Sequence, residues 1–454
     1  MKQMGFIWRW ALAIGFLLGN ICVVFAQNDS VCTREEQIYH FFIANQGDSI
    51  FHSLSPDAQK KVSRVMCQDL LPQVERQFGK LQSAGKWQQD SLSGIILKYR
   101  DLKFERYQLR LQFSFGPEGM LEGLWMKPVP ETSTVPPAAY NKEKMEEREV
   151  MIETGSFKLP GTLTLPKAAV SAGGHKVPCV ILVHGSGAQD RDETIGPNKP
   201  FRDLAYGLAE RGVAVIRYEK RTKVYGEACV PAGRELDFDV ETVDDALSAV
   251  ALAKTIPEIA PDSIYVLGHS QGGLLAPRIA ERSEGLAGIV ILAGPARPLA
   301  DIMVEQLTYL TSLPGTPAAA ASQVEEIKKQ YANMKKLGTD TFNDSIPLPL
   351  GFVKSYALFE KNYKPVEVAA KLKLPILVLQ GERDYQVTME DFGLWRSGLL
   401  RCKNASFKSY PKLNHLLQEG SGKATPFEYN HASSAPAYVM DDIALFVRGK
   451  LVTP

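Results

Sequence analysis

The sequence has almost no net charge. It contains 52 Lys and Arg residues against 51 Asp and Glu residues, which gives a formal charge of +1 at pH 7. The charge balance therefore does not favour nucleic acid or an acidic surface as a partner. Hydrophobic residues make up 45% of the chain and charged residues 23%, as in ordinary soluble proteins. This composition argues against a disordered chain and against a protein that crosses a membrane many times.

Cysteine is also scarce, with six residues among 454. That number is too small for a scaffold held together by disulfides, and no group of Cys and His residues has the spacing of a metal site. We expect neither a metal nor an organic cofactor. Cys32 and Cys67 lie in one small predicted domain, so our hypothesis is a disulfide between them in an oxidising compartment. The alternative is that both are small buried apolar residues.

The apolar run near the N-terminus, from Ala11 to Phe25, is shorter than the roughly 20 residues of a membrane-spanning helix. Lys2 and Arg9 form a basic start, and Ala26 offers a small residue for cleavage before Gln27. Residues 1–26 are therefore predicted to be a signal peptide. The mature protein is expected in the periplasm or outside the cell, without stable membrane insertion. A retained membrane anchor is the alternative.

The length predicts more than one domain. Apolar residues recur at helical spacing over residues 33–71, and the rhythm changes toward strands over 94–127, so residues 27–128 are predicted to form a small α+β domain. Prolines and charges over 129–147 predict a linker. The segment GMLEGLWMKP, residues 119–128, resembles the nuclear-transport-factor-like accessory domain of some secreted bacterial hydrolases. Three roles stay open for this domain: binding of substrate, an oligomer contact, or stabilisation of the chain.

Residues 148–454 alternate short apolar runs with helical stretches, which predicts a doubly wound, mostly parallel α/β sheet. The expected strands are Val177–Val183, Val213–Tyr218, Ile264–Leu267, Gly288–Leu292, Pro375–Gln380 and Ala405–Tyr410. The expected helices include Phe201–Arg211, Val243–Ala253 and Ala437–Val447. Residues 295–372 are far too many for a sheet crossover, and helical spacing within them predicts a helical cap inserted over the carboxyl edge of the sheet.

The segment Gly268-His269-Ser270-Gln271-Gly272 carries the clearest chemical signal. It follows a predicted strand and opens a predicted helix, the context in which a G-x-S-x-G turn exposes a serine nucleophile. The two outer glycines allow the sharp turn. Ser270 is therefore the expected nucleophile.

A serine hydroxyl needs a base to take its proton. His415 follows the last predicted strand, where the chain order serine, acid, histidine places the base. His431 is the fallback. The imidazole in turn needs a carboxylate, and Asp384 follows a buried strand and a glycine turn between Ser270 and His415. Glu382 is expected to meet solvent or a local partner instead.

Acyl transfer also needs donors for the developing oxyanion. The turn Val183-His184-Gly185-Ser186-Gly187 is glycine-rich and follows the third strand of the predicted sheet domain, so the backbone N–H of Ser186 is one expected donor. The backbone N–H of Gln271 is the other. His184 is expected to brace the turn, and Asp190, Arg191 and Asp192 to hold the loop through ion pairs.

These motifs, together with VIRYEKR and LNHLL, make residues 148–454 resemble the α/β-hydrolase superfamily. The nearest resemblance is to secreted bacterial esterases of the serine-aminopeptidase-like branch that carry a helical cap. That branch usually has Asp where this sequence has Glu219, which puts the local geometry of that turn in doubt.

The resemblance implies hydrolysis of carboxylic esters of short to medium acyl chain. An aminopeptidase acting on short peptides is the rival enzyme, and a binding protein that has lost activity is the rival of another class. The expected partner is a small ester molecule.

Overall fold

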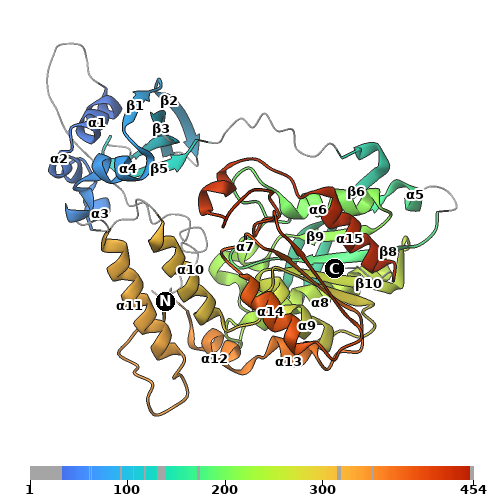
Figure 1. Cartoon of the computed structure of the whole chain (residues 1–454). Coiled ribbons are helices and arrows are strands. Elements are labelled where there is room, and N and C mark those ends of the chain that lie inside the picture. Colours follow the sequence, from blue (N-terminus) through green and yellow to red (C-terminus); the bar gives the residue numbers. More distant parts are fainter. Residues whose placement is uncertain are drawn as a thin grey trace. The chain divides into compact units, whose positions relative to one another are not determined.

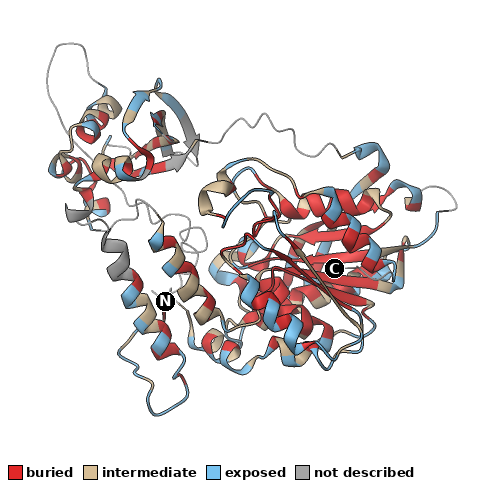
Figure 2. Cartoon of the chain, viewed as in Figure 1, coloured by how far each residue is buried: buried red, intermediate tan, exposed pale blue. Residues whose placement is uncertain are grey.

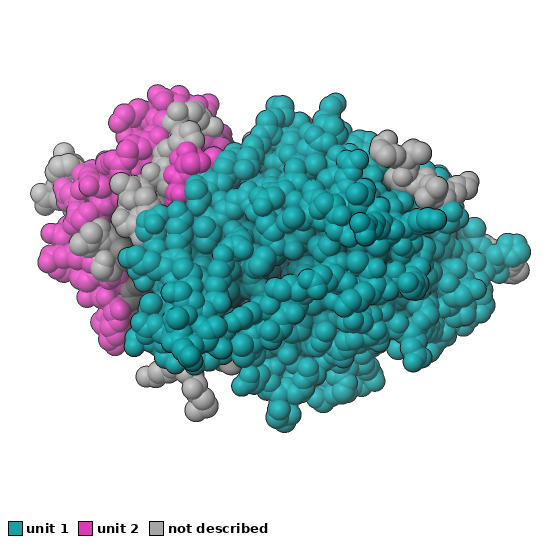
Figure 3. All heavy atoms as spheres, turned by 60° about the horizontal axis from the view of Figure 1, so that its bottom comes forward, with its two compact units in different colours: residues 1–13, 132–309, 324–454 teal, residues 14–131, 310–323 magenta. Residues whose placement is uncertain are grey.

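The computed structural model describes residues 33–60, 62, 64–92, 95–105, 107–116, 119–129, 140–170, 174–313, 318–349 and 352–449. The predicted signal peptide, Cys32 and most of the predicted linker lie outside these residues. The described residues up to 129, with those between 310 and 323, form one compact unit, and the remaining described residues form a second, larger one (Figure 3).

None of the helices in the described part of the chain is both long and apolar enough to cross a membrane. No group of three or more His, Cys, Asp or Glu side chains in it could hold a metal ion.

Helices followed by an antiparallel sheet make up the N-terminal unit, as the predicted small α+β domain requires. Its helices are α1 (Arg34–Ile43), α2 (Gly47–Phe51), α3 (Pro56–Gln59), a 3₁₀ turn (Arg64–Cys67) and α4 (Leu70–Phe78). Its strands are β1 (Leu81–Ala84), β2 (Gln88–Leu92), β3 (Ile95–Phe104), β4 (Gln108–Phe115) and β5 (Leu121–Pro128), paired in the order β1-β3-β4-β5 with β2 on β3. Helix α1 ends just before Asn45, which adopts a positive φ of 55°, and α4 ends at Gly79, which adopts a φ of 81°.

The larger unit is built on an eight-stranded sheet (Figure 1). Its strands are β6 (Met145–Thr154), β7 (Phe157–Pro166), β8 (Val177–Val183), β9 (Ala214–Tyr218), β10 (Ile259–His269), β11 (Gly288–Leu292), β12 (Ile376–Gly381) and β13 (Ala405–Tyr410). They lie in the order β13-β12-β11-β10-β8-β9-β7-β6, and every pair from β13 to β9 is parallel. The predicted doubly wound, mostly parallel sheet is therefore confirmed, with an antiparallel β6–β7 hairpin at one end.

Helices cover both faces of this sheet because alternate residues of each buried strand point to opposite sides. Val180 and Leu182 of β8 pack with α6 (Pro200–Glu210) and α15 (Ala437–Val447). Ile181 and Val183 belong to the other apolar cluster, with α8 (Asp244–Thr255), α9 (Gln271–Arg282) and α14 (Met389–Gly398). Buried residues accordingly follow the strands in Figure 2. Shorter elements are α5 (Lys167–Val170), α7 (Arg221–Tyr225), 3₁₀ turns at Lys142–Lys144, Gly226–Cys229 and Pro426–Asn430, and a π-helical turn at Asp239–Val243.

The chain between β11 and β12 is helical, as predicted for the inserted segment. It contains α10 (Leu299–Ser312), α11 (Ala318–Met334), α12 (Lys354–Asn362) and α13 (Pro365–Ala369). Three residues at helical spacing, Tyr331, Met334 and Leu337, are buried and pack together with Ala300 and Ala357. The insertion therefore has a small apolar core of its own.

Candidate active site

The turn from β10 into α9 holds Ser270 in a strained conformation, with φ 53° and ψ −117°. Its backbone N–H donates to the carbonyl of Leu292 at 2.9 Å, which ties the turn to β11. A Cβ on Gly272 would lie 2.1 Å from the carbonyl oxygen of Val183, and one on Gly268 would lie 2.0 Å from that of Gly272. Only glycine fits at both positions, so the G-x-S-x-G spacing is what permits the sharp turn.

The loops after β12 and β13 bring Asp384 and His415 together. Nδ1–H of His415 donates to Oδ2 of Asp384 at 2.6 Å, and both residues are buried. The other carboxylate oxygen accepts the backbone N–H groups of Gln386 and Val387, at 2.7 and 3.1 Å. The carboxylate is thus fixed from both sides, and it holds the imidazole in the tautomer that leaves Nε2 free to accept a proton.

His269 connects the base loop to the nucleophile turn. This residue precedes Ser270, and its Nε2–H donates to the backbone carbonyl of His415 at 2.9 Å. The rings of His269 and His415 lie 4.7 Å apart between centroids. The backbone of the candidate base is therefore held against the turn that carries the candidate nucleophile.

The alternatives to this pair have other surroundings. His431 is exposed, whereas His415 is buried beside Asp384. Glu382 is exposed and accepts the hydroxyl of Ser409 at 2.7 Å, the local partner that the sequence led us to expect.

The glycine-rich loop after β8 lies against the nucleophile. A Cβ on Gly185 would be 3.2 Å from Cβ of Ser270. Within the part of the chain that the structure describes, neither the backbone N–H of Ser186 nor that of Gln271 donates to another group. Among the described residues, both expected donors are therefore without another acceptor.

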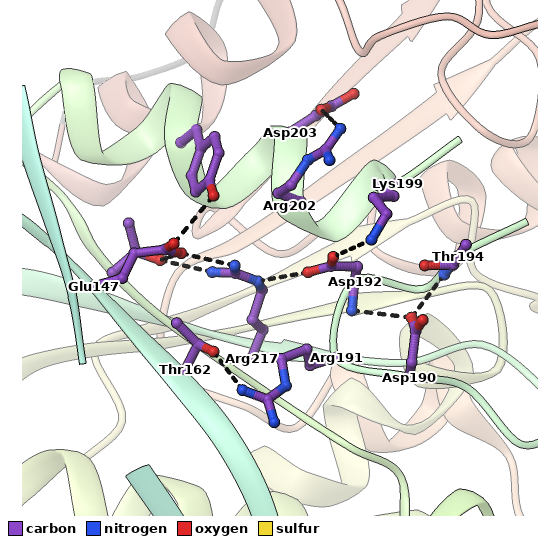
Figure 4. A network of polar contacts seen from close by, with 12 residues as sticks. Glu147, Thr162, Asp190, Arg191, Asp192, Thr194, Lys199, Arg202, Asp203 and Arg217 are labelled. Atoms are coloured by element: carbon purple, nitrogen blue, oxygen red, sulfur yellow. Dashed lines mark hydrogen bonds and ion pairs between the residues drawn. The ribbon is translucent and has the colours of Figure 1, made fainter. Parts of the chain in front are cut away.

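Polar contacts hold the end of this loop (Figure 4). Oδ1 of Asp190 accepts the backbone N–H groups of Asp192 and Thr194, at 3.1 and 2.9 Å. The carboxylate of Asp192 pairs with Lys199 at 2.7 Å and with Arg217 at 3.0 Å. The loop is tied in this way to α6 and β9.

Arg191 extends the same network to the strand hairpin. Its guanidinium pairs with Glu149 of β6 at 2.7 Å and with Glu219 at 2.9 Å. Glu219, the departure from the branch pattern, therefore still reaches the loop. The ion pairs expected for Arg191 and Asp192 are confirmed. The one expected for Asp190 is wrong, because among the described residues its carboxylate accepts backbone N–H groups instead.

His184 braces the turn, as expected. Its side chain is buried, and Nε2–H donates to the backbone carbonyl of Asp190 at 3.0 Å. Burial lowers the pKa of His184 to about 4, so the ring is neutral near pH 7. A neutral ring with one fixed N–H has a structural role.

Glu193 is a site residue that the sequence reasoning missed. Its carboxylate is buried, accepts the backbone N–H of Gly185 at 2.7 Å, and accepts Nδ1–H of His269 at 2.8 Å. Burial opposes ionisation of both side chains, but their mutual attraction outweighs it: the pKa of Glu193 is lowered and that of His269 is raised. The only local signal was its place at the end of the charged run Asp190–Glu193.

The inserted helix α12 contributes aromatic side chains near the site. Rings of Tyr356 and Phe359 pack on Phe238, with centroids 4.5 and 5.2 Å apart. Phe238 also lines a cavity of about 160 Å³ together with Leu274, which follows Ser270 by one helical turn. Apolar surface thus lies beside the helix that begins at the nucleophile.

The sheet order, the strand–turn–helix at Ser270 and the later Asp384–His415 pair define the α/β-hydrolase class. The chain belongs to the serine aminopeptidase S33 family, whose profile matches residues 176–420.

Among characterised relatives, the chain is 39% identical over 345 residues to esterase EstD of Thermotoga maritima, covering 76% of this chain and 77% of EstD. Among solved structures, Est1E of Butyrivibrio proteoclasticus with bound ferulic acid is 18% identical, with a TM-score of 0.42, over 66% of this chain and 100% of that one. The Pyrococcus furiosus esterase Pf2001 is 16% identical, with a TM-score of 0.43, over 69% and 95%.

Proposed function

We propose that this protein is a serine esterase that hydrolyses carboxylic esters of short to medium acyl chain through an acyl-enzyme on Ser270. Its 39% identity to an esterase supports ester hydrolysis as the activity. The observation that carries the residue assignment is the 2.6 Å hydrogen bond from His415 to Asp384, in a site where Gly185 touches the strained Ser270 turn.

In the first step, Oγ of Ser270 attacks the ester carbonyl while Nε2 of His415 takes its proton. The carbonyl oxygen becomes an oxyanion and accepts hydrogen bonds from the backbone N–H groups of Ser186 and Gln271. The intermediate collapses as His415 returns the proton to the leaving alcohol. Asp384 stabilises the imidazolium throughout.

In the second step, water attacks the acyl-enzyme. His415 takes the proton of the water, and the same two N–H groups bind the new oxyanion. As the intermediate collapses, His415 returns the proton to Oγ of Ser270, which restores the hydroxyl and releases the carboxylic acid. No metal or organic cofactor enters this scheme.

The test is hydrolysis of p-nitrophenyl esters of graded acyl length, beside aminoacyl-p-nitroanilides, by the wild type and by Ser270→Ala. We expect the wild type to prefer the shorter esters and Ser270→Ala to lose at least ~10⁴-fold in kcat. Ser409→Ala is a matched control, because among the described residues that hydroxyl donates to Glu382, away from the proposed triad. Full ester turnover by Ser270→Ala would exclude the proposed nucleophile, and preference for the anilides would make the protein an aminopeptidase.

We further propose that residues 1–26 direct export and that the N-terminal unit is a nuclear-transport-factor-like accessory domain. The basic start and the apolar run of the sequence support export. The helices followed by an antiparallel sheet support the accessory domain. N-terminal sequencing of the protein recovered from the expressing cells tests the first point: a start at Gln27 is expected, and a start at Met1 would contradict it.

A further inference from the structure

Lys220 is a fully buried lysine beside the nucleophile turn. It follows β9, and only 2% of its surface is exposed. Its ammonium donates to the backbone carbonyl of Gly185 at 2.9 Å, to Oε1 of Gln271 at 3.0 Å and to Oε1 of Glu241 at 2.9 Å. The three N–H bonds of a lysine therefore meet three acceptors, and two of these belong to the loop and turn of the expected oxyanion donors.

The bond to Gly185 determines where the N–H of Ser186 points. The carbonyl of Gly185 and the N–H of Ser186 belong to one peptide unit, which is planar, so in the trans form the two groups point in opposite directions. An ammonium that holds the carbonyl therefore holds the N–H pointing away from Lys220. The N–H of Gly185 is held as well, by Glu193 at 2.7 Å. The loop is thus fixed on both sides of the donor peptide.

The second donor residue is held by the same ammonium. The side-chain amide of Gln271 accepts from Lys220 and donates through Nε2 to Oε2 of Glu241 at 3.1 Å. Gln271 is buried, and its backbone N–H opens α9. Its side chain therefore anchors the first turn of the helix from which the oxyanion receives its second hydrogen bond.

Glu241 links this arrangement to the inserted helix α12. It lies in the π-helical turn Asp239–Val243, a type of turn often found at functional sites, and it is buried. Its carboxylate balances the charge of Lys220 and also accepts the hydroxyl of Tyr356 from α12. A contact of the insertion therefore reaches the loop through two buried charges.

We propose that Lys220 is a positioning residue that aligns both oxyanion donors, with Glu241 as its counterion and Tyr356 as its connection to the inserted helix. This inference rests on the proposed function, because it assigns a role in ester hydrolysis. The negative charge on the oxyanion exists in the transition state and not in the bound ester. Loss of Lys220 therefore affects kcat and leaves KM nearly unchanged.

The experiment compares wild type, Lys220→Met and Lys223→Met on the best p-nitrophenyl ester, with an alkyl trifluoromethyl ketone as a transition-state analogue. Lys223 lies in helix α7, which begins directly after Lys220, and it is exposed, so its variant controls for the substitution itself. We expect Lys220→Met to lower kcat by ~10- to 100-fold, which is less than the loss of an oxyanion donor causes. Binding of the ketone should weaken by a similar factor. KM and the values for Lys223→Met should stay within about twofold of wild type.

A buried lysine can also matter only for folding, and a second variant separates the two roles. Lys220→Met/Glu241→Gln removes both buried charges and leaves neither unpaired. Burst titration counts competent sites, and kcat is expressed per site. We expect this double variant to keep both the reduced kcat and the weakened binding of the ketone. Wild-type kcat per site in the double variant would overturn the proposal.

Two further outcomes are distinguishable. Tyr356→Phe should lower kcat less than Lys220→Met does, with Tyr438→Phe as control, since Tyr438 makes the same kind of hydroxyl–carboxylate bond on the surface. If Tyr356→Phe keeps the wild-type kcat, Tyr356 does not connect Lys220 to α12.

Failure of this inference is distinguishable from failure of the proposed function. If Ser270→Ala retains full activity, the proposed function fails. If Ser270→Ala is inactive and Lys220→Met is not impaired, only the inference on Lys220 fails.

Discussion

The carboxylate of Glu193 and the ring of His269 form a buried ion pair, with Oε2 and Nδ1 2.8 Å apart. The partners come from the loop after β8 and from the end of β10. The second carboxylate oxygen holds Gly185, and the second ring nitrogen holds the carbonyl of His415. One pair of side chains therefore joins the oxyanion loop, the nucleophile turn and the base loop.

Glu193→Ala should destabilise the protein by about 3 kcal/mol or more at about pH 6, because it removes the acceptor of the buried Nδ1–H of His269 and of the N–H of Gly185. Activity per folded molecule should fall too, since the oxyanion loop loses an anchor. Urea denaturation and kcat per titrated site measure the two effects. Glu227→Ala changes an exposed glutamate and should alter neither; a Glu193→Ala protein as stable as this control would show that the pair contributes nothing.

The same pair predicts a pH dependence of stability. The pKa of Glu193 is lowered on folding, so its contribution is present above about pH 4.3, the ordinary glutamate value, and is lost as pH falls through the folded value. The pKa of His269 is raised, so its contribution is present below about pH 6.5 and is lost as pH rises through the folded value.

The pair should therefore stabilise the protein most between about pH 4.3 and pH 6.5. Glu193→Gln removes the charge but keeps the shape of the side chain. The loss of unfolding free energy caused by this substitution should be larger at about pH 6 than at about pH 9. An equal loss at both values would contradict the ion pair.

The parts of the site that the sequence could reveal are those recorded in a local pattern. Ser270 is flanked by a strand, a helix and two obligatory glycines, and all of these are visible within a short segment. Asp384 and His415 were found because each follows a strand of the sheet. Some strand limits also came from local pattern: β8 and β11 begin and end where their apolar runs do, and β13 has the limits that were predicted for it.

Lys220 lies within the VIRYEKR motif, but no local spacing marks Glu193, Lys220 or Glu241 as a buried residue. Each lies in a segment rich in charged residues, where an exposed side chain is the ordinary expectation. Their burial is decided by packing between segments far apart in the chain, which no local spacing records. In the N-terminal unit, β1 and β2 were missed for a related reason: they are short, polar strands whose pairing with β3 supplies most of their order.

Two glycines allow a matched test of backbone crowding. Gly272→Ala would force a Cβ to 2.1 Å from the carbonyl of Val183, so we expect a loss of more than about 3 kcal/mol or failure to fold. Gly393→Ala places its Cβ in open space on the exposed face of α14, and should stabilise the protein by about 0.5–1 kcal/mol. Thermal unfolding compares them. If Gly272→Ala is as stable as the wild type, the turn has more space for a Cβ than the 2.1 Å distance indicates.

Asp203 on α6 is a buried carboxyl group that tests what ionisation costs inside the protein. One oxygen accepts the backbone N–H of Ala435 at 3.2 Å; the other has no hydrogen-bond partner among the described residues, and the guanidinium of Arg202 lies 3.7 Å away (Figure 4). Burial raises the pKa of Asp203 to about 6. The folded protein thus keeps this proton to a higher pH than the unfolded chain does.

Ionisation of Asp203 therefore costs stability, and the cost grows as pH rises from about 4 to about 6. Asp203→Asn keeps the acceptor for Ala435 and removes the charge. We expect it to raise the free energy of unfolding by about 2 kcal/mol at about pH 8 and by much less at about pH 4, where the carboxyl is already protonated in the folded state. Urea denaturation at the two values measures the difference. Asp262→Asn changes an exposed carboxyl and should leave the free energy of unfolding the same at both pH values. If Asp203→Asn stabilises the protein equally at both pH values, the effect comes from packing and not from charge.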